Sequence, residues 1–278
     1  MSTAPFVRSI LHPTDFSDSS LVAFHHALAL TVRCQGELTL LHAGGDAGGD
    51  PFEHFPAVRR TLERWGYLDA GSPSSAVLDR LGVRVRKVNL RNRDPLEAAH
   101  RVLDKGHTDL VALATEAREG LPGWLRPSTA ERIARETHSM SLFVQEGVRG
   151  FVDQQGRIAL SRIVVPIAVA PDAQPALIAA ARLATLADAR VEIVLCHVGE
   201  DPMPPVMTPH DPRIVFRTEQ RHGDVVHEIE QLIRELAADL VVMATDGRDG
   251  FLGAMGRGSH TERVVRQCAC PVLAVPVI

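Results

Sequence analysis

The chain of 278 residues contains the same pattern twice, and this repeat limits its fold more than any other feature. TDLVALAT at 108–115 matches ADLVVMAT at 238–245. STAERIARETHSMSLFV at 128–144 matches SHTERVVRQCACPVLAV at 259–275. The segments that open each copy, ILHPTDFSD and IVVPIAVAPD, keep the same order. One structural unit therefore occurs twice in the chain.

The repeat also sets the expected domain limits. We predict a first domain over 1–147, a hairpin linker over 148–160 and a second domain over 161–278. The copies differ between their second and third strands. There the second copy has EDPMPPVMTPHDPR, whose five prolines cannot form a helix. We expect a helix at this place in the first domain only.

Each copy alternates short apolar runs with amphipathic stretches. SILHPT and RIVVPI are typical of strands that are buried on both faces. The stretch after Ser17 brings an apolar set near one face of a helix: Leu21, Phe24, Leu28 and Val32. This alternation predicts an α/β fold with two open, parallel, doubly wound domains. The last strand of each domain would be an exposed edge, so we expect these edges to pair and to form an intramolecular pseudo-dimer.

Composition excludes several classes of partner. The net charge is −4 at pH 7, so the chain has no basic field for nucleic acid. Apolar runs are too short to span a membrane, and the N-terminus does not have the pattern of a signal peptide. The four cysteines do not form the framework of a small secreted domain. We therefore expect a cytoplasmic protein that binds neither nucleic acid nor membrane.

The second copy contains a glycine-rich stretch between a strand and a helix. Ligands of doubly wound sheets bind beyond the carboxyl ends of the strands, where the strand order reverses. Gly247, Gly250 and Gly258 would let backbone N–H groups approach a phosphate closely. The helix that follows, from Ser259, would offer further N–H groups, and Arg257 would add positive charge. This stretch predicts an anion site.

Several segments of the sequence resemble those of a known family. ILHPTDFSDSS, the strand ends LLHA and LCHV, and ATDGRDGFLGAMGRGSHTERVVRQCACPVLAV together resemble the universal stress protein family, in two tandem copies. The resemblance implies a Rossmann-like fold of the adenine nucleotide alpha hydrolase type. It also implies an ATP or AMP ligand, held by a loop of the pattern Gly-x2-Gly-x9-Gly-Ser/Thr and by an Asp at the end of strand one.

Each copy keeps about half of that pattern. The first copy has Asp15 at the end of strand one, but its loop carries Ala117 and Pro127 at glycine positions. Proline has no N–H to donate to an anion. The second copy keeps Gly247, Gly250 and Gly258, yet Ala168 stands where the first copy has Asp15. We therefore expect a weak or partial adenine-nucleotide site in the second domain.

Simpler roles are open for several of these residues. Ser259 begins a Ser-x-x-Glu capping box, so it caps a helix with or without a phosphate. Asp15 also suits the role of a helix cap. Cys268 and Cys270 align with Thr137 and Ser139 of the first copy, which favours small packing residues over a metal or redox pair. We predict no metal site.

The chain shows no catalytic motif. It has no Gly-x-Ser-x-Gly elbow, no His-Glu-x-x-His and no Walker loop. We expect a non-enzymatic stress-response protein that senses or carries a ligand. Two alternatives stay open: a protein-interaction module with vestigial sites, and a slow ATP hydrolase. The sequence does not identify a protein partner, and further dimerisation of the whole chain is also open.

Overall fold

The computed structural model describes residues 5–44, 52–91, 94–104, 106–115, 129–136, 139–245 and 260–277. The first half contains, in chain order, β1 Ser9–Pro13, α1 Asp18–Cys34, β2 Glu37–Gly44, α2 Val58–Arg64, α3 Ala76–Leu81, β3 Arg84–Arg91, α4 Pro95–Leu103, β4 Leu110–Thr115, α5 Thr129–Glu136 and β5 Met140–Gln145. The second half contains β6 Arg162–Pro166, α6 Gln174–Ala184, β7 Val191–Val198, β8 Ile214–Arg221, α7 Val225–Leu236, β9 Leu240–Thr245, α9 His260–Gln267 and β10 Val272–Pro276.

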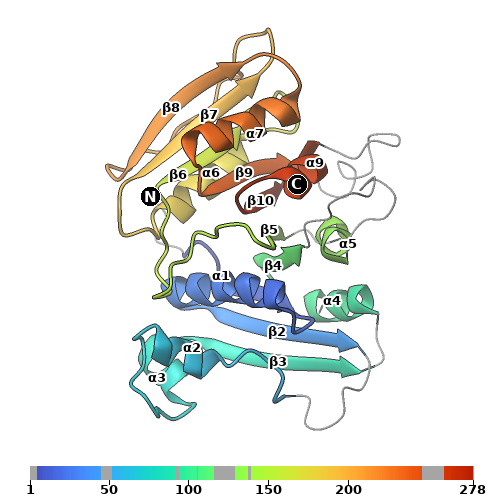
Figure 1. Cartoon of the computed structure of the whole chain (residues 1–278), viewed down its shortest axis with the longest axis vertical. Helices are drawn as coiled ribbons and strands as arrows, with labels where there is room; N and C mark the ends of the chain where they lie inside the picture. Colours follow the sequence, from blue (N-terminus) through green and yellow to red (C-terminus); the bar gives the residue numbers. More distant parts are fainter. Residues whose placement is uncertain are drawn as a thin grey trace.

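The strands form one ten-stranded sheet in the order β3-β2-β1-β4-β5-β10-β9-β6-β7-β8. Within each half all the pairs are parallel, and the halves join through the antiparallel pair of β5 and β10 (Figure 1). The order reads alike from either end, with β3 and β8 at the two edges. The predicted α/β fold and the pairing of the last strands are confirmed. The domain limits at residues 147 and 161 stay a prediction.

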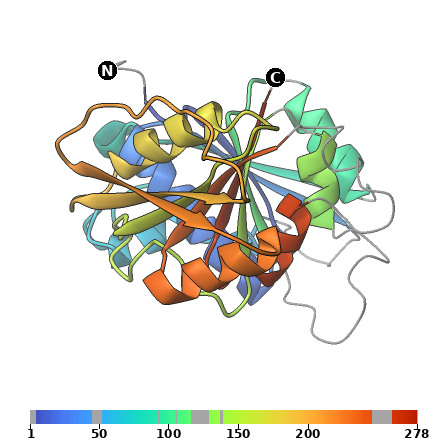
Figure 2. The ribbon, with the colours of Figure 1, turned by 90° about the horizontal axis from the view of Figure 1, so that it is seen from above.

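Helices cover both faces of the sheet, and each face has its own apolar cluster (Figure 2). Residues of α1, α2, α3 and α6 belong to one cluster. Residues of α4, α5, α7 and α9 belong to the other. Both clusters contain residues of both halves. The sheet is therefore buried on its two faces, as the uninterrupted apolar strands predicted.

Polar side chains cap the starts of three helices. Ser17 is the N-cap of α1 and accepts a hydrogen bond from the Ser20 amide. Asp94 and Asp224 cap α4 and α7 in the same way. The predicted apolar face of α1 is wrong at Leu21, which is 40% exposed. The buried face of α1 is rotated toward Ala23, Ala27 and Leu30, because β4 and β5 of the sheet lie beneath that side.

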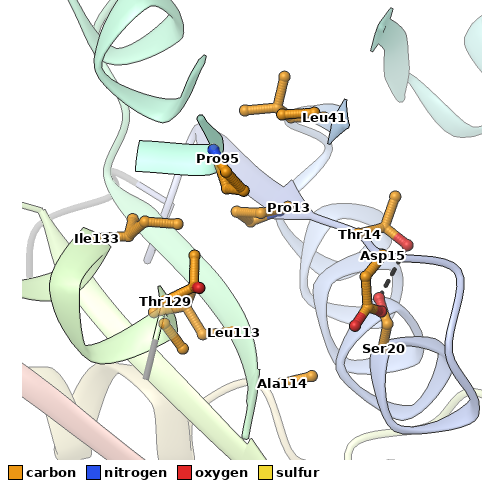
Figure 3. A pocket seen from close by; sticks show the side chains of 12 residues that line it. Pro13, Thr14, Asp15, Ser20, Leu41, Pro95, Leu113, Ala114, Thr129 and Ile133 are labelled. Atoms are coloured by element: carbon orange, nitrogen blue, oxygen red, sulfur yellow. Dashed lines mark hydrogen bonds between the residues drawn. The ribbon is translucent and has the colours of Figure 1, made fainter. Parts of the chain in front are cut away.

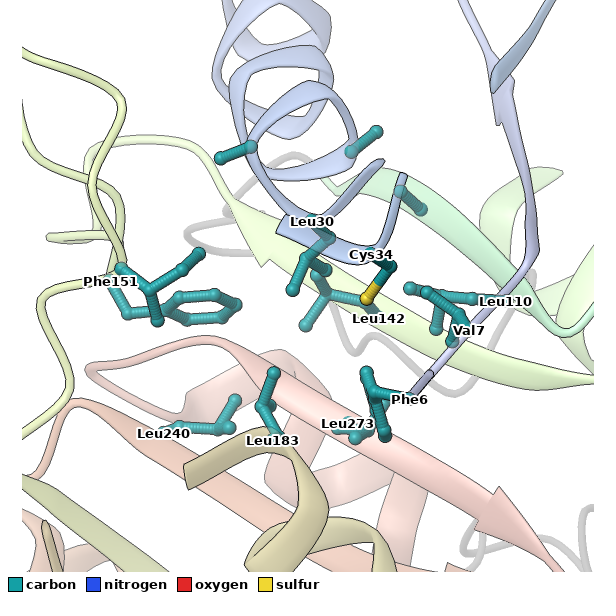
Figure 4. Close-up of a cluster of buried hydrophobic side chains, with 14 of the residues drawn as sticks. Phe6, Val7, Leu30, Cys34, Leu110, Leu142, Phe151, Leu183, Leu240 and Leu273 are labelled. Atoms are coloured by element: carbon teal, nitrogen blue, oxygen red, sulfur yellow. The ribbon is translucent and has the colours of Figure 1, made fainter. Parts of the chain in front are cut away.

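Two further segments pack in the apolar cluster that the halves share (Figure 4). Phe6 and Val7, at the N-terminal end, are buried in the same cluster as Leu183 and Leu273 of the second half. In the segment between the halves, Val152 pairs with Ile158 in an antiparallel bridge. The buried Phe151 ring beside this bridge belongs to the same cluster.

The two halves differ between their second and third strands. The first half has α2 and α3 there, in place of the single helix that the sequence predicted. Among the described residues of the second half, 199–213 contain no helix. Part of this segment is tied to α6, because the Gln174 side chain accepts a hydrogen bond from the Met207 amide (2.8 Å) and donates one to its carbonyl (2.9 Å).

An ion pair joins α5 of the first half to α9 of the second. Arg266 donates through Nε and Nη2 to the two carboxylate oxygens of Glu131, at 2.7 and 2.8 Å. The Glu131 side chain is only 4% exposed and that of Arg266 is 28% exposed. Beside it, the Gln145 side chain donates to the Val265 carbonyl. Without Arg266 the buried Glu131 would lose this bidentate ion pair, and breaking a buried pair by removing one partner is strongly destabilising.

We expect Arg266→Met to lower the free energy of unfolding by about 3 kcal/mol, because it leaves the Glu131 carboxylate buried without this partner. Urea unfolding followed by circular dichroism measures the loss. The matched control is Arg263→Met on the same helix, whose pair with Asp224 is exposed. That variant should lose less than about 1 kcal/mol. Equal losses in the two variants would contradict a structural role of the Glu131 pair.

A buried histidine fixes the connecting segment to α1. His26 Nδ1 lies 2.9 Å from the Val22 carbonyl, and the Phe151 amide donates to His26 Nε2 at 3.0 Å. These partners require a neutral ring with its proton on Nδ1. Burial disfavours the charged form and lowers the pKa of His26 from 6.5 to about 4. Burial likewise lowers the pKa of His12, on β1, to about 4.

The free energy of unfolding should therefore fall as the pH drops from about 6.5 toward 4. In this range His26 and His12 bind protons in the unfolded chain but stay neutral in the folded one. Each such histidine contributes a slope of about 1.4 kcal/mol per pH unit inside this window. His26→Gln should reduce the slope by about 1.4 kcal/mol per pH unit, which is the contribution of one proton. Urea unfolding at several pH values measures it, with the exposed His227→Gln as control. An unchanged slope in His26→Gln would refute the assignment.

Candidate functional site

The strand order reverses twice, once in each half. In the first half β2 and β4 lie on opposite sides of β1, and in the second half β7 and β9 lie on opposite sides of β6. Connections from the carboxyl ends of these strands therefore diverge, which leaves space for a ligand at each point. The chain thus has two equivalent positions for a site.

The position in the first half is a pocket of about 180 Å³ (Figure 3). Asp15, Thr14 and Ser20 lie on one side of it, with Thr129 and Ile133 of α5 across from them. Leu41 of β2 and Pro95 at the start of α4 also line the pocket. The volume is below the roughly 300 Å³ at which pockets for drug-sized ligands begin. The described walls therefore have room for part of a nucleotide only.

Asp15 does not cap α1 directly. Its Oδ1 accepts hydrogen bonds from the Ser17 amide (3.0 Å) and the Ser17 hydroxyl (2.6 Å), and Ser17 is the residue that caps the helix. Partial burial opposes ionisation of the carboxyl, but the hydrogen bonds from Ser17 outweigh it and lower the pKa of Asp15. The pocket therefore contains a carboxylate, which is negative at neutral pH.

A polar network of His12, Thr14 and Ser20 lies next to Asp15. Ser20 Oγ donates to Thr14 Oγ1 at 2.9 Å and lies 3.3 Å from His12 Nε2. His12 Nδ1 lies 2.9 Å from the Ala112 carbonyl on β4, so the network ties β1 to β4. In the second half, Val165 and Ile167 at the places of His12 and Thr14 are apolar and buried, and the N-cap of α6 is Ala173, which forms no side-chain cap hydrogen bond. The sequence analysis did not predict that His12, Thr14 or Ser20 supports a site. The available signal was the occurrence of polar residues within and just after an apolar strand.

One histidine in each half ties strand two to the end of strand one. His42 Nδ1 lies 2.8 Å from the Thr14 carbonyl, and His197 Nδ1 lies 2.8 Å from the Ile167 carbonyl. In the first half the His42 ring also stacks on Phe16, with 4.1 Å between ring centroids. Phe16 has a φ of 68°, in the left-handed region that costs a bulky residue strain. The two histidines are therefore positioning residues at equivalent points of the two sites.

The predicted site residues fall on two different positions. Asp15 lies in the pocket of the first half. Of the residues expected at the second position, five lie outside the described residues: Gly247, Gly250, Arg257, Gly258 and Ser259. The described chain brackets them, because β9 ends at Thr245 and α9 begins at His260. Ala168, in the place of Asp15, is exposed just after the end of β6.

The two neighbouring cysteines near the C-terminus are packing residues in the core. Cys268 and Cys270 are buried in the cluster on the α9 face of the sheet. The neighbouring Cys268, together with burial, raises the pKa of the Cys270 thiol above its ordinary range. In the part of the chain that the structure describes, no group of three or more His, Cys, Asp or Glu could hold a metal ion. Within the same ranges, no helix has the length and apolar character that crossing a membrane requires.

The fold and its two switch points define an α/β protein of the type that binds ligands beyond strand ends. The universal stress protein family matches the sequence over residues 7–145 and 207–276. These two segments cover most of the chain, and they agree with the two copies found in the sequence. The chain belongs to the universal stress protein family.

Solved structures support the fold over nearly the whole chain. A universal stress protein from Archaeoglobus fulgidus DSM 4304 is 16% identical, with a TM-score of 0.62, over 96% of this chain and 98% of that one. A protein of unknown function from Pseudomonas aeruginosa PAO1 is 14% identical, with a TM-score of 0.58, over 97% and 92%. At these identities the likeness shows the fold alone. No curated protein matches the sequence.

Proposed function

We propose that this universal stress protein senses or carries a ligand and binds an adenine nucleotide, ATP or AMP, weakly through its second domain. Backbone N–H groups near Gly247, Gly250 and Gly258 would hold the phosphates. Ser259, at the start of the following helix, and Arg257 would add hydrogen bonds and charge. The proposal includes the domain limits 1–147 and 161–278, and the cytoplasmic location that the sequence predicted.

The observation that supports this choice is the different charge at the two strand ends. In the first half the pocket contains the Asp15 carboxylate, whose pKa is lowered. A carboxylate repels phosphate, so this position disfavours the charged end of a nucleotide. In the second half Ala168 replaces it. The second copy therefore lacks this carboxylate at the end of its first strand.

Asp15 suits a different part of a ligand. An ionised carboxylate accepts hydrogen bonds, so Asp15 could accept them from ribose hydroxyls or from the amino group of a base. The pocket of about 180 Å³ beside it has mostly apolar walls, including Leu41, Leu113 and Ile133. We assign Asp15 to sugar or base recognition at most. Phosphate binding in the first half would need donors that Pro127 does not supply.

The proposed contacts are sufficient for weak binding. An anion at a helix N-terminus gains about 0.3–1 kcal/mol when exposed and up to about 2 kcal/mol when partly buried. Micromolar affinity corresponds to about 8 kcal/mol. Several backbone donors, one arginine and burial of the adenine ring together reach that range. A loop with fewer donors does not.

We expect Gly258→Pro to weaken nucleotide binding at least tenfold, because proline removes an N–H donor next to the proposed phosphate and reproduces the Pro127 of the first copy. Calorimetric titration with AMP, ADP and ATP measures the affinity, and circular dichroism checks the fold. The matched variant Asp15→Ala makes the first copy resemble the second at Ala168, and its affinity should equal that of the wild type.

Two results would count against this assignment. Equal affinity in Gly258→Pro and wild type would show that the glycine stretch is a turn without a phosphate. Loss of binding in Asp15→Ala alone would place the nucleotide in the first half. A chain that binds none of the three nucleotides would favour the alternative of a protein-interaction module.

We also expect no ATP hydrolysis above background. Phosphoryl transfer needs a group that holds a metal ion and a group that orients water. The glycine stretch 246–258 contains no lysine, and the second copy has no Asp at the end of strand one. Phosphate release from radiolabelled ATP tests this prediction. A turnover of about 1 per second, within the range of phosphoryl-transfer enzymes, would establish the chain as an ATP hydrolase.

A further inference from the structure

The first half has a second and larger pocket, remote in sequence from the strand ends. It measures about 540 Å³ and lies between α2, α3 and the edge strand β3. This volume falls within the roughly 300–1,000 Å³ of small-molecule sites. Its lining comes from residues 57–60, 74, 77–78, 83–85 and 87, and it shares no residue with the pocket at Asp15. In Figure 1 these elements form the end of the molecule farthest from β8.

The lining is cationic on one side, and its described residues include no acidic side chain. Arg59 and Arg60 come from α2, and Arg84 and Lys87 come from β3. Two of these side chains are held in place. Arg59 donates to the Ser72 carbonyl at 2.8 Å and lies 3.7 Å from Glu63, while the Lys87 ammonium lies 5.6 Å from the centroid of the Phe55 ring.

The other two cations differ from this pair. Among the described residues, neither Arg60 nor Arg84 forms an ion pair. Glu37 is the register partner of Arg84 on β2, but no salt bridge joins them within the described chain. Both arginines are exposed. The positive charge of this pocket is therefore compensated at Arg59 and available at Arg60 and Arg84.

The rest of the lining is apolar. Val58, Val77 and Val83 belong to the lining and are buried. Leu78, on α3, is 49% exposed and lies in the same lining. The lining thus combines apolar side chains with cations. This combination matches a ligand with one apolar part and one negative part.

Protection of a sheet edge explains only part of this arrangement. Basic residues on an edge strand discourage pairing with another chain, and Arg84 and Lys87 on β3 agree with that role. Arg59 and Arg60 lie on a helix, however, and the edge argument does not apply to them. The edge argument also gives no reason for the half-exposed Leu78 in the same lining. Helices α2 and α3 belong to the insertion that distinguishes the first half from the second.

We propose that this pocket binds a small amphipathic organic anion, a carboxylate with an aliphatic chain. The carboxylate would lie between Arg60 and Arg84, where guanidinium groups offer paired donors. The chain would cover Leu78 and the three buried valines. This site is separate from the proposed nucleotide site and does not depend on it.

Decanoate is the probe, and calorimetric titration of the full chain measures its affinity at concentrations below micelle formation. Acetate has the same charged group without the chain, and decanol has the chain without the charge. We expect decanoate to bind at one site and both controls to bind at least tenfold more weakly. Amide chemical shifts should change at residues 57–60, 74–78 and 83–87.

Arg60→Glu should weaken decanoate binding at least tenfold, because it reverses an exposed charge at the mouth of the pocket. The matched control is Arg101→Glu, an exposed arginine on α4, which packs on the other face of the sheet. Leu78→Gln should weaken decanoate binding but leave acetate unchanged.

Three results would overturn the proposal. They are equal affinity in Arg60→Glu and Arg101→Glu, equal affinity for decanoate and decanol, and chemical-shift changes outside the named residues. Nucleotide titration of Arg60→Glu separates the two sites, since its nucleotide affinity should match that of the wild type.

Discussion

The whole structure depends on the antiparallel pairing of β5 with β10. Each half alone would end in an apolar strand with unpaired backbone groups, an edge that attracts other chains. Pairing Ser141–Phe143 with Val272–Ala274 removes both edges at once and makes one sheet of ten strands. The apolar clusters on the two faces then extend across the junction. This central pair joins the two halves, each with its own helices and strand ends, into one body.

The two halves share a backbone arrangement and differ in chemistry. His42 and His197 make the same hydrogen bond at equivalent points. Around them the first half has a carboxylate and a polar network, whereas the second half has apolar residues. The insertion with α2 and α3 adds a second difference, because it places arginines and open apolar surface at one end of the molecule. A chain with two copies can therefore present three chemically distinct surfaces on one fold.

The sequence predicted the fold through signals that are local or repeated. Buried strands and the pairing of the last strands follow from apolar runs and the edge argument. Exposure of Leu21 did not follow, because the sheet beneath α1, rather than helical period alone, decides which face is buried. The surroundings of Asp15 did not follow either, because Asp15 holds the cap residue Ser17 through a turn that a pattern of residue types does not specify. The bond of Arg266 to Glu131 also escaped prediction, since it joins residues that only the pairing of the halves brings together.

The Glu131–Arg266 ion pair has a thermodynamic consequence. It joins α5 to α9, the two helices that follow the connections after β4 and β9. A ligand that favours one position of α9 would also favour one position of α5, as long as the buried bond is kept. The two halves are therefore tied near their strand ends by a buried bond as well as by the sheet itself.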